Sequence, residues 1–324
     1  MQIVLDTRGM QMSVRNHCFL FSNGERTNIV HPERISSIVV TAPCRISSPA
    51  ILLAAENQIP LVICNPCGQP QARLWSSQFF NTSSLRRKQY QFTISVNGIS
   101  WAETIIKLKI NEQWGNLKYF FTETHSTSNE SKILKEMMRY SEVNYTANEK
   151  NTIDAKKKIL FMEAYVASQY WQNMGKELPE PFKLINRVKR KPSDPFNAMI
   201  NYLYGMLRNE VETAVLSIGL DPALGVMHRD GYRMASLIFD LMEPFRPFMD
   251  KILWTTVKLG QFPADGFQLE PDAPCQITKT GRKYLIQLFT ATLHSKTKYR
   301  QSNNTLRNHI LTETKRLSDL IKQQ

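Results

Sequence analysis

The feature that most constrains the fold is a change of residue pattern near residue 85. Before it, short runs rich in β-branched residues, such as QIVLD and ISSIVV, alternate with turn residues. After it, long segments carry apolar residues three and four positions apart and contain few Gly or Pro. We therefore expect an α+β chain, with a small, mostly-β N-terminal domain at residues 1–84 and a larger all-α C-terminal domain at residues 85–324.

The first part carries local signals for turns and caps. Asn23-Gly24 sits between two strand-like runs and predicts a tight hairpin turn. Ser47 or Ser48, followed at once by a proline, predicts the start of a short helix. The run LVIC after that helix is typical of a buried strand.

The second part is expected to contain helices over about 99–121 (one or two), 152–174, 193–220, 231–243 and 304–322. The helix over 193–220 has the clearest ends, because Ser193 or Asp194 can cap it and Gly219 lies where it should stop. Pro244 and Pro247 are expected to limit or kink the end of the helix over 231–243.

The charge balance points to a polyanionic partner. Lys and Arg exceed Asp and Glu by 41 to 28, which gives a net charge of +13. Such a balance attracts nucleic acid or an anionic membrane surface, although a generically basic soluble protein is the alternative. No apolar run approaches the ~20 residues of a membrane span, and the N-terminus lacks a signal-peptide pattern. We expect a soluble, intracellular protein that does not act at a membrane.

The five cysteines do not form the pattern of a secreted disulfide framework. Cys64 and Cys67 have the CxxC spacing of a zinc site, but the second close pair that such a site needs is missing. We favour a turn after a buried strand whose two thiols happen to be near each other.

Residues 218–247 carry the strongest candidates for chemistry. Asp240 and Glu243 are three apart, so they project from one side of the expected helix. One interpretation is that this side is an ordinary solvated helix face. The alternative interpretation is that His228, in the preceding turn, joins the two acids to bind a divalent ion, for which Mn²⁺ or Mg²⁺ is better suited than zinc.

Glu163 is a further candidate, since it falls on the apolar face of the helix over 152–174. A buried carboxylate needs a partner, because burying an unpaired charge is costly. The partner is a metal ion on one reading, and a lysine or a backbone group on the other. The sequence leaves both open. With a basic surface nearby, an acid and histidine cluster of this kind suits metal-assisted chemistry on a phosphodiester.

Basic residues form groups that can neutralise phosphates without reading bases. They occur at 156–158, in KLINRVKRK (183–191) and over 282–300, although any one group is also compatible with a solvated loop or helix face. Arg246 either pairs with a carboxylate or contacts phosphate, and the sequence does not choose. The candidates for contact with a DNA backbone are Arg187, Lys189, Arg190, Lys191 and Arg246.

Several motifs in a fixed order resemble one known family. FMEAYVASQYW is followed by DPFNAMINYLYGML, then by GLDPALGVMH and SLIFDLMEPFRP. This series is similar to the signature of the CRISPR-associated integrase-endonuclease, the Cas-one family. The resemblance is strong over about 85–260, and outside that range it lies in character more than in motif.

The resemblance implies a fold with an N-terminal β-domain that forms a homodimer and a helical domain that holds Mg²⁺ or Mn²⁺. It implies Glu163, His228 and Glu243 as catalytic metal ligands, with Asp240 beside them as a supporting group or additional ligand. It also implies a complex with the small Cas-two protein in a prokaryotic cytoplasm. The activity would be spacer acquisition for antiviral defence. Its DNA partners would be double-stranded: the incoming protospacer, whose 3′-hydroxyl attacks, and the CRISPR repeat, which is attacked.

Two other functions remain compatible with the residues. One is a non-catalytic basic scaffold, whose binding to DNA would be sensitive to salt and would need no metal. The other is a general nuclease for repair of branched DNA, which shares the metal chemistry but not the partner protein. An acid cluster repels DNA unless a metal ion neutralises it, and this favours the enzyme over the scaffold.

Overall fold

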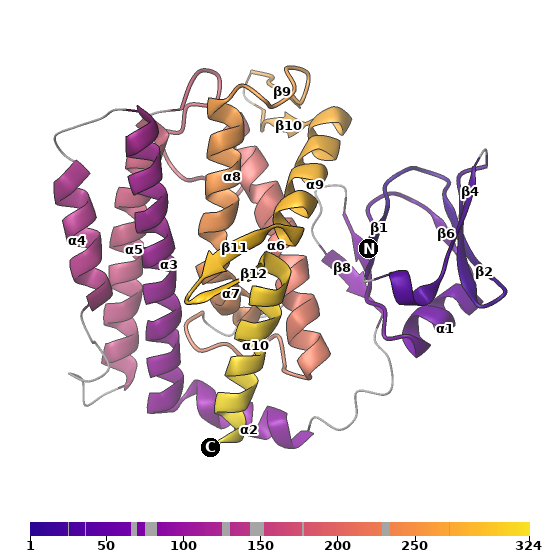
Figure 1. The fold of residues 1–324 in the computed structure, drawn as a ribbon, viewed down its shortest axis with the longest axis horizontal. Coiled ribbons are helices and arrows are strands. Elements are labelled where there is room, and N and C mark those ends of the chain that lie inside the picture. Colours follow the sequence, from indigo (N-terminus) through magenta and orange to yellow (C-terminus); the bar gives the residue numbers. More distant parts are fainter. Residues whose placement is uncertain are drawn as a thin grey trace. The chain divides into compact units, whose positions relative to one another are not determined.

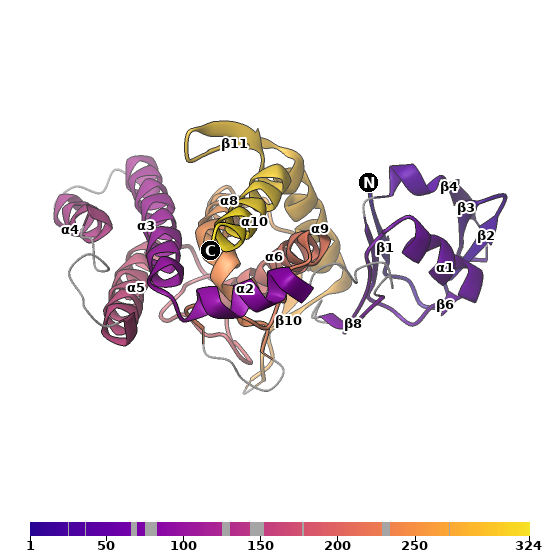
Figure 2. The same cartoon turned by 90° about the horizontal axis from the view of Figure 1, so that it is seen from below.

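The computed structural model describes residues 1–24, 26–35, 37–65, 70–74, 83–124, 130–142, 152–176, 178–228, 234–271 and 273–324. The chain forms two compact units, Met1–Thr82 and Ser83–Gln324. Strands dominate the first unit and helices the second, as Figures 1 and 2 show. The predicted α+β class is therefore confirmed.

The first unit contains two four-stranded sheets. One has the order β1 (Gln2–Leu5), β5 (Ser37–Val40), β7 (Leu61–Cys64) and β8 (Pro70–Arg73), with only the β7–β8 pair antiparallel. The other has the order β4 (Thr27–Val30), β3 (Cys18–Ser22), β2 (Gln11–Arg15) and β6 (Arg45–Ile46). Helix α1 (Ser48–Glu56) packs on β2, and the 3₁₀ turn η1 (Pro32–Arg34) precedes β5. Side chains from both sheets form one apolar core, which includes Leu5, Ile38, Met12 and Phe19.

The local sequence signals for a turn and for a helix cap in this unit are confirmed. The predicted turn at Asn23-Gly24 joins β3 to β4, and Gly24 has a φ of +91° that favours glycine. Ser47 caps α1, since its hydroxyl accepts a hydrogen bond from the Ala50 amide at 3.4 Å. The turn between β2 and β3 was not predicted, because Asn16 and His17 adopt positive φ without a glycine.

The second unit is mostly helical. Its helices are α2 (Ser83–Thr93), α3 (Val96–Thr124), α4 (Glu130–Glu142), α5 (Thr152–Lys176), α6 (Pro195–Ile218), α7 (Ser236–Met242), the 3₁₀ turn η3 (Glu243–Phe245), α8 (Arg246–Lys258), α9 (Lys279–His294) and α10 (Leu306–Lys322). Two short antiparallel pairs interrupt them: β9 (Phe267–Gln268) with β10 (Gln276–Ile277), and β11 (Lys296–Tyr299) with β12 (Ser302–Thr305). The unit is thus mostly, not purely, helical.

Helix α6 ends where its caps predicted. The Asp194 carboxylate accepts a hydrogen bond from the Asn197 amide at 2.7 Å, and Gly219 closes the helix with a φ of +85°. The prediction for Pro244 is confirmed in so far as α7 ends at Met242, but the helical segments that follow were not foreseen. Helical structure continues past both, because each proline lies in the first turn of a new segment, where no amide donor is required. Residues 231–233, expected to be helical, lie outside the described residues.

Helix α3 is the element that positions the candidate site. It packs against α4, α5, η3 and α8, and both views show α8 on the side away from α4. Helix α6 packs in turn on α7, α8 and α10. No helix in the described part of the chain is both long and apolar enough to cross a membrane.

Candidate functional site

Two of the predicted acids meet at one lysine. Lys109 lies in the middle of α3, and its side chain is only 8% exposed. Its ammonium donates a hydrogen bond to Oε1 of Glu163, on α5, and lies 2.7 Å from Oε2 of Glu243, at the start of η3. The packing of α3 on both elements therefore brings together two carboxylates that are distant in the sequence.

This arrangement gives Glu163 a charged partner. Its partner in the structure is a lysine, as one of the two readings expected. Lys109 was not singled out from the sequence, because nothing in its local pattern distinguishes it from the other lysines of α3. Only the tertiary packing shows that this lysine is buried between two acids.

Glu243 is held by two cations. Oε1 lies 3.0 Å from Nε of Arg246, and Oε2 faces Lys109. Burial alone would raise the pKa of the Glu243 carboxyl, but Arg246 and Lys109 outweigh it and lower this pKa to about 2, with a further contribution from His228. Burial would likewise lower the pKa of Lys109, but Glu243 and Glu163 outweigh it and raise this pKa. Glu243 and Lys109 are therefore both charged at neutral pH.

Arg246 takes the first of its two expected roles. It pairs with the Glu243 carboxylate, and its guanidinium lies over the Tyr204 ring at 4.7 Å from the centroid. The side chain is 18% exposed. It therefore holds the acid in place in this structure, and its contact with phosphate stays a prediction.

His228 is oriented by Asp240. The Asp240 side chain is fully buried, and its Oδ1 lies 2.6 Å from Nδ1 of His228. A carboxylate only accepts here, so Nδ1 carries the proton and Nε2 is the nitrogen that can bind a metal. Asp240 also accepts hydrogen bonds from the amides of Val226, Met227 and His228, at 2.6, 3.0 and 3.1 Å. A buried carboxylate that holds a histidine ring is a common support for metal-binding histidines.

The reading of Asp240 and Glu243 as a solvated helix face is wrong. Asp240 is inaccessible to solvent and Glu243 is 6% exposed, because α7 packs on α6 and η3 packs on α3. Apolar residues at three and four spacing suggested a solvent side that this buried segment does not have.

Asp250 is a further buried acid, connected to the site through Tyr204 and Arg246. Asp250, on α8, accepts a hydrogen bond from the Tyr204 hydroxyl at 2.6 Å. Burial raises the pKa of Asp250 to about 6, against the opposing effects of the Tyr204 hydrogen bond and of Arg187. This residue was missed, because FRPFMDKILW reads as one more amphipathic segment.

The basic loop before α6 divides into two kinds of residue. Arg187 is half-buried: it donates to Asn197 Oδ1 at 2.8 Å and Asn201 Oδ1 at 2.6 Å. Burial also lowers the pKa of this arginine. Lys189, Arg190 and Lys191 are exposed. Of the predicted contacts to DNA in this loop, these three present their charge to solvent.

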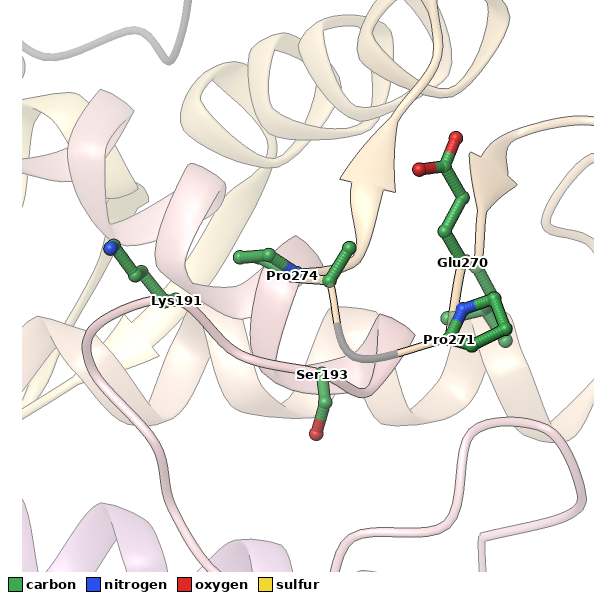
Figure 3. A pocket seen from close by; sticks show the side chains of 7 residues that line it. Lys191, Ser193, Glu270, Pro271 and Pro274 are labelled. Carbon is green, nitrogen blue, oxygen red and sulfur yellow. The ribbon is translucent and has the colours of Figure 1, made fainter.

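A hollow lies beside this loop. It is lined by Lys191, Ser193, Leu269, Glu270, Pro271, Ala273 and Pro274. In Figure 3 the Lys191 side chain and the Glu270 carboxylate point away from each other. None of the proposed ligands lines this hollow, so it offers no group for the expected chemistry.

The acids and the histidine are the groups that could bind a divalent ion. Within the described ranges, no three His, Cys, Asp or Glu side chains converge closely enough to hold one ion. However, Oε2 of Glu243 is buried and receives no well-aligned hydrogen bond from these residues; the Lys109 ammonium at 2.7 Å is an ion-pair contact. Two carboxylates and an imidazole nitrogen suit Mg²⁺ or Mn²⁺. The donor set therefore suits the ion by type, although Lys109 now lies between the two acids.

The CxxC pair belongs to the first unit. Cys64 is buried at the end of β7, in the first unit. Cys67 lies outside the described residues, so a zinc site at this pair stays untested.

The family model for CRISPR associated protein Cas1 matches residues 3–291. The chain belongs to the Cas1 family. Among curated Cas1 relatives, a CRISPR-associated endonuclease Cas1 of Korarchaeum cryptofilum is 29% identical over 79% of this chain and 77% of its own length. One from Archaeoglobus fulgidus is 27% identical over 94% of this chain and 91% of its own length.

Solved structures share the fold of this Cas1 protein. A casposase bound to its integration product has a TM-score of 0.82 at 21% identity, covering 100% of this chain and 91% of its own. A Cas1 protein of Thermotoga maritima has a TM-score of 0.78 at 17% identity, with coverage of 99% and 97%. A chain of a Cas6-RT-Cas1–Cas2 complex has a TM-score of 0.79 at 18% identity, covering 100% of this chain and 35% of its own.

Proposed function

We propose that this Cas1 protein is a metal-dependent DNA endonuclease and integrase of CRISPR adaptation. The observation that carries the proposal is the meeting of Glu163 and Glu243 at one buried cation, beside a histidine whose free nitrogen is set by Asp240. Curated relatives are named endonucleases, and a neighbour in fold is a casposase bound to an integration product. Both support chemistry on a DNA backbone.

In this proposal Glu163, His228 and Glu243 bind Mg²⁺ or Mn²⁺. The bound ion would polarise a phosphoryl oxygen and promote attack by a hydroxyl group. Arg246 keeps the Glu243 carboxylate ionised and fixed, and Asp240 keeps the His228 ring in the tautomer that exposes Nε2. Lys189, Arg190 and Lys191 attract the phosphates of the substrate.

The proposed reaction is a transesterification. The 3′-oxygen of the incoming DNA forms a bond to a phosphorus at the end of the repeat, and the bond from that phosphorus to the repeat's own 3′-oxygen breaks. The attacking hydroxyl loses its proton, and the leaving oxygen gains one. With water in place of the 3′-hydroxyl, the same site would cleave DNA.

The proposed partners are double-stranded DNA, a second copy of the chain and a Cas2 protein. The similar fold of a chain in a Cas6-RT-Cas1–Cas2 complex supports the Cas2 partner. The role of the first unit in dimerisation is carried over from the resemblance, as is the placement of the protein in a prokaryotic cytoplasm.

The test is strand transfer of a short duplex with free 3′-hydroxyl ends into a plasmid that carries the repeat, with Cas2 and Mn²⁺. We expect product that chelator abolishes, and a loss of at least about 100-fold in Glu163→Gln, His228→Ala and Glu243→Gln. Glu180→Gln is the matched control, because Glu180 is an exposed acid that also pairs with a lysine, at 3.1 Å. DNA binding without product, unaffected by chelator, would instead favour a scaffold.

A further inference from the structure

Lys109 occupies the position between the two proposed ligands. Its ammonium contacts both Glu163 and Glu243, and its side chain is almost fully buried. Burying a lysine is costly unless its charge is balanced. Here two carboxylates balance its charge, so the ammonium neutralises the two acids as a bound cation would.

Glu243 shows why this matters for metal binding. Both of its oxygens already face a cation: Oε1 faces Arg246 at 3.0 Å and Oε2 faces Lys109 at 2.7 Å. A divalent ion bound to this carboxylate would lie within a few ångströms of a positive group in the same buried space, where like charges repel strongly. One of the two cations must therefore give way.

Lys109 is the cation that is free to leave. Arg246 is fixed by its stacking over Tyr204, whose hydroxyl is in turn bonded to Asp250 at 2.6 Å. Lys109 has a flexible four-carbon stem. Its contact with Oε2 of Glu243 is an ion pair without hydrogen-bond alignment, as is that of Arg246 Nε with Oε1, so the freedom of the stem is what distinguishes Lys109. It is also the one cation that contacts both acids among the described residues.

We propose that Lys109 is an internal counter-cation that holds Glu163 and Glu243 together until a divalent ion displaces it. The inference rests on the proposed function, because it takes these two acids as metal ligands. Lys109 therefore competes with the metal and weakens its binding, while it stabilises the metal-free fold. It is a positioning residue, since it acts through the two carboxylates.

Lys107 provides a matched control on the same helix. It is also a partly buried lysine, paired with Glu103 at 2.9 Å, and its side chain is 24% exposed. Its partner is not one of the proposed ligands. Replacing it removes the same charge from α3 and leaves the proposed site intact.

The experiment is calorimetric titration of the purified full chain with Mn²⁺, together with electron paramagnetic resonance of free Mn²⁺ and thermal unfolding with and without the ion. The variants are Lys109→Met, Lys109→Gln, Lys107→Met and Glu163→Gln. Lys109→Gln keeps a polar group in the site, so it carries the test if Lys109→Met does not fold.

We expect both Lys109 variants to bind Mn²⁺ roughly tenfold tighter than the wild type or more, because a competing charge has been removed. Their metal-free unfolding temperature should fall below that of the wild type and recover with Mn²⁺. Lys107→Met should bind as the wild type does, and Glu163→Gln should bind more weakly.

Two results would overturn the inference in different ways. If the Lys109 variants bind Mn²⁺ as tightly as the wild type or more weakly, while Glu163→Gln binds more weakly, Lys109 does not compete with the ion. The proposed function would then remain intact. Failure of the wild type to bind Mn²⁺, or unchanged binding by Glu163→Gln, would remove the metal site itself and both proposals with it.

Discussion

At the scale of single residues, Asp240 uses both carboxylate oxygens to fix the turn that carries His228. Oδ2 accepts from two backbone amides, and Oδ1 accepts from the His228 amide and ring. Four donors converge on one buried side chain. Any replacement that cannot accept at both oxygens must leave some of these donors unsatisfied.

The substitution Asp240→Asn tests this role. An asparagine oxygen can serve one pair of donors, but its amide then faces the other pair. If the amide faces the His228 ring, Nδ1 must become the acceptor and Nε2 must carry the proton, so Nε2 can no longer bind metal. We expect Mn²⁺ affinity to fall by about 10–100-fold, measured by calorimetry. Unchanged affinity would contradict this; the control Asp319→Asn alters an exposed acid.

Asp250 predicts a pH effect on stability. Its pKa is raised on folding from 3.8 to about 6, so between these values the folded protein binds more protons than the unfolded chain. The free energy of unfolding should therefore fall as pH rises through this window, by about 3 kcal/mol from this group.

Urea unfolding of the wild type and of Asp250→Asn at a series of pH values measures this effect. Other groups titrate in both proteins, so the informative quantity is the difference between the two stability curves. The wild type should lose stability relative to the variant as pH rises from about 4 to 6. Parallel curves over that range would show that Asp250 has an ordinary pKa.

Sequence reasoning found some residues of the site and missed others for a physical reason. His228, Asp240 and Glu243 lie close together in the chain, so their types and spacing are visible directly. Lys109 and Asp250 matter only because α3 and α8 pack beside the acids, and no local pattern marks a lysine or an aspartate that will be buried by such packing.

At the scale of elements, the turn before α7 depends on close packing. A Cβ added at Gly225 would lie 2.6 Å from the Ser236 backbone carbon and 2.9 Å from Oδ2 of Asp240. The turn can approach α7 this closely only with glycine at that position. The approach is what allows Asp240 to reach the amides of the turn.

The exposed basic loop before α6 gives a prediction about DNA binding. Replacing Lys189, Arg190 and Lys191 together by Ala removes up to three phosphate contacts. The slope of log K against log salt should then become shallower by at most about 2.7. Fluorescence anisotropy with a labelled duplex at several salt concentrations measures the slope. The control is Lys315→Ala, which replaces an exposed lysine of α10 and should leave the slope unchanged. An unchanged slope in the triple variant would show that the loop does not contact DNA.

Local end signals made α6 predictable, but at α8 they misled. Helix α6 was predicted from its aspartate cap and terminal glycine. Helix α8 was missed, because Pro244 and Pro247 were taken as the end of a helix when they open new helical segments. Proline is common both just after a helix and in the first turn of a helix. The packing of the surrounding residues decides which of the two occurs.

At the scale of the whole molecule, the change of residue pattern near residue 85 predicted a β-rich part followed by a helical part. The short pairs β9–β10 and β11–β12 could not be foreseen, because their strands are only two to four residues long. Periodicity needs longer segments than these to separate strand from loop.

The proposed homodimer predicts a particular mass in solution. The chain is 37.4 kDa, so light scattering after size exclusion should give twice that value. A monomer at all concentrations up to about 100 μM, well above the Kd of a stable dimer interface, would contradict the proposed homodimer. This result would leave the geometry of the site untouched.

The most direct test of the central claim is anomalous scattering from crystals grown with Mn²⁺. A divalent ion held by this chain should give one strong anomalous peak within about 2.5 Å of a carboxylate oxygen of Glu163, a carboxylate oxygen of Glu243 and Nε2 of His228, with Lys109 turned away. A peak at other residues, or Lys109 still bridging both acids in a crystal with Mn²⁺ bound elsewhere, would contradict the account.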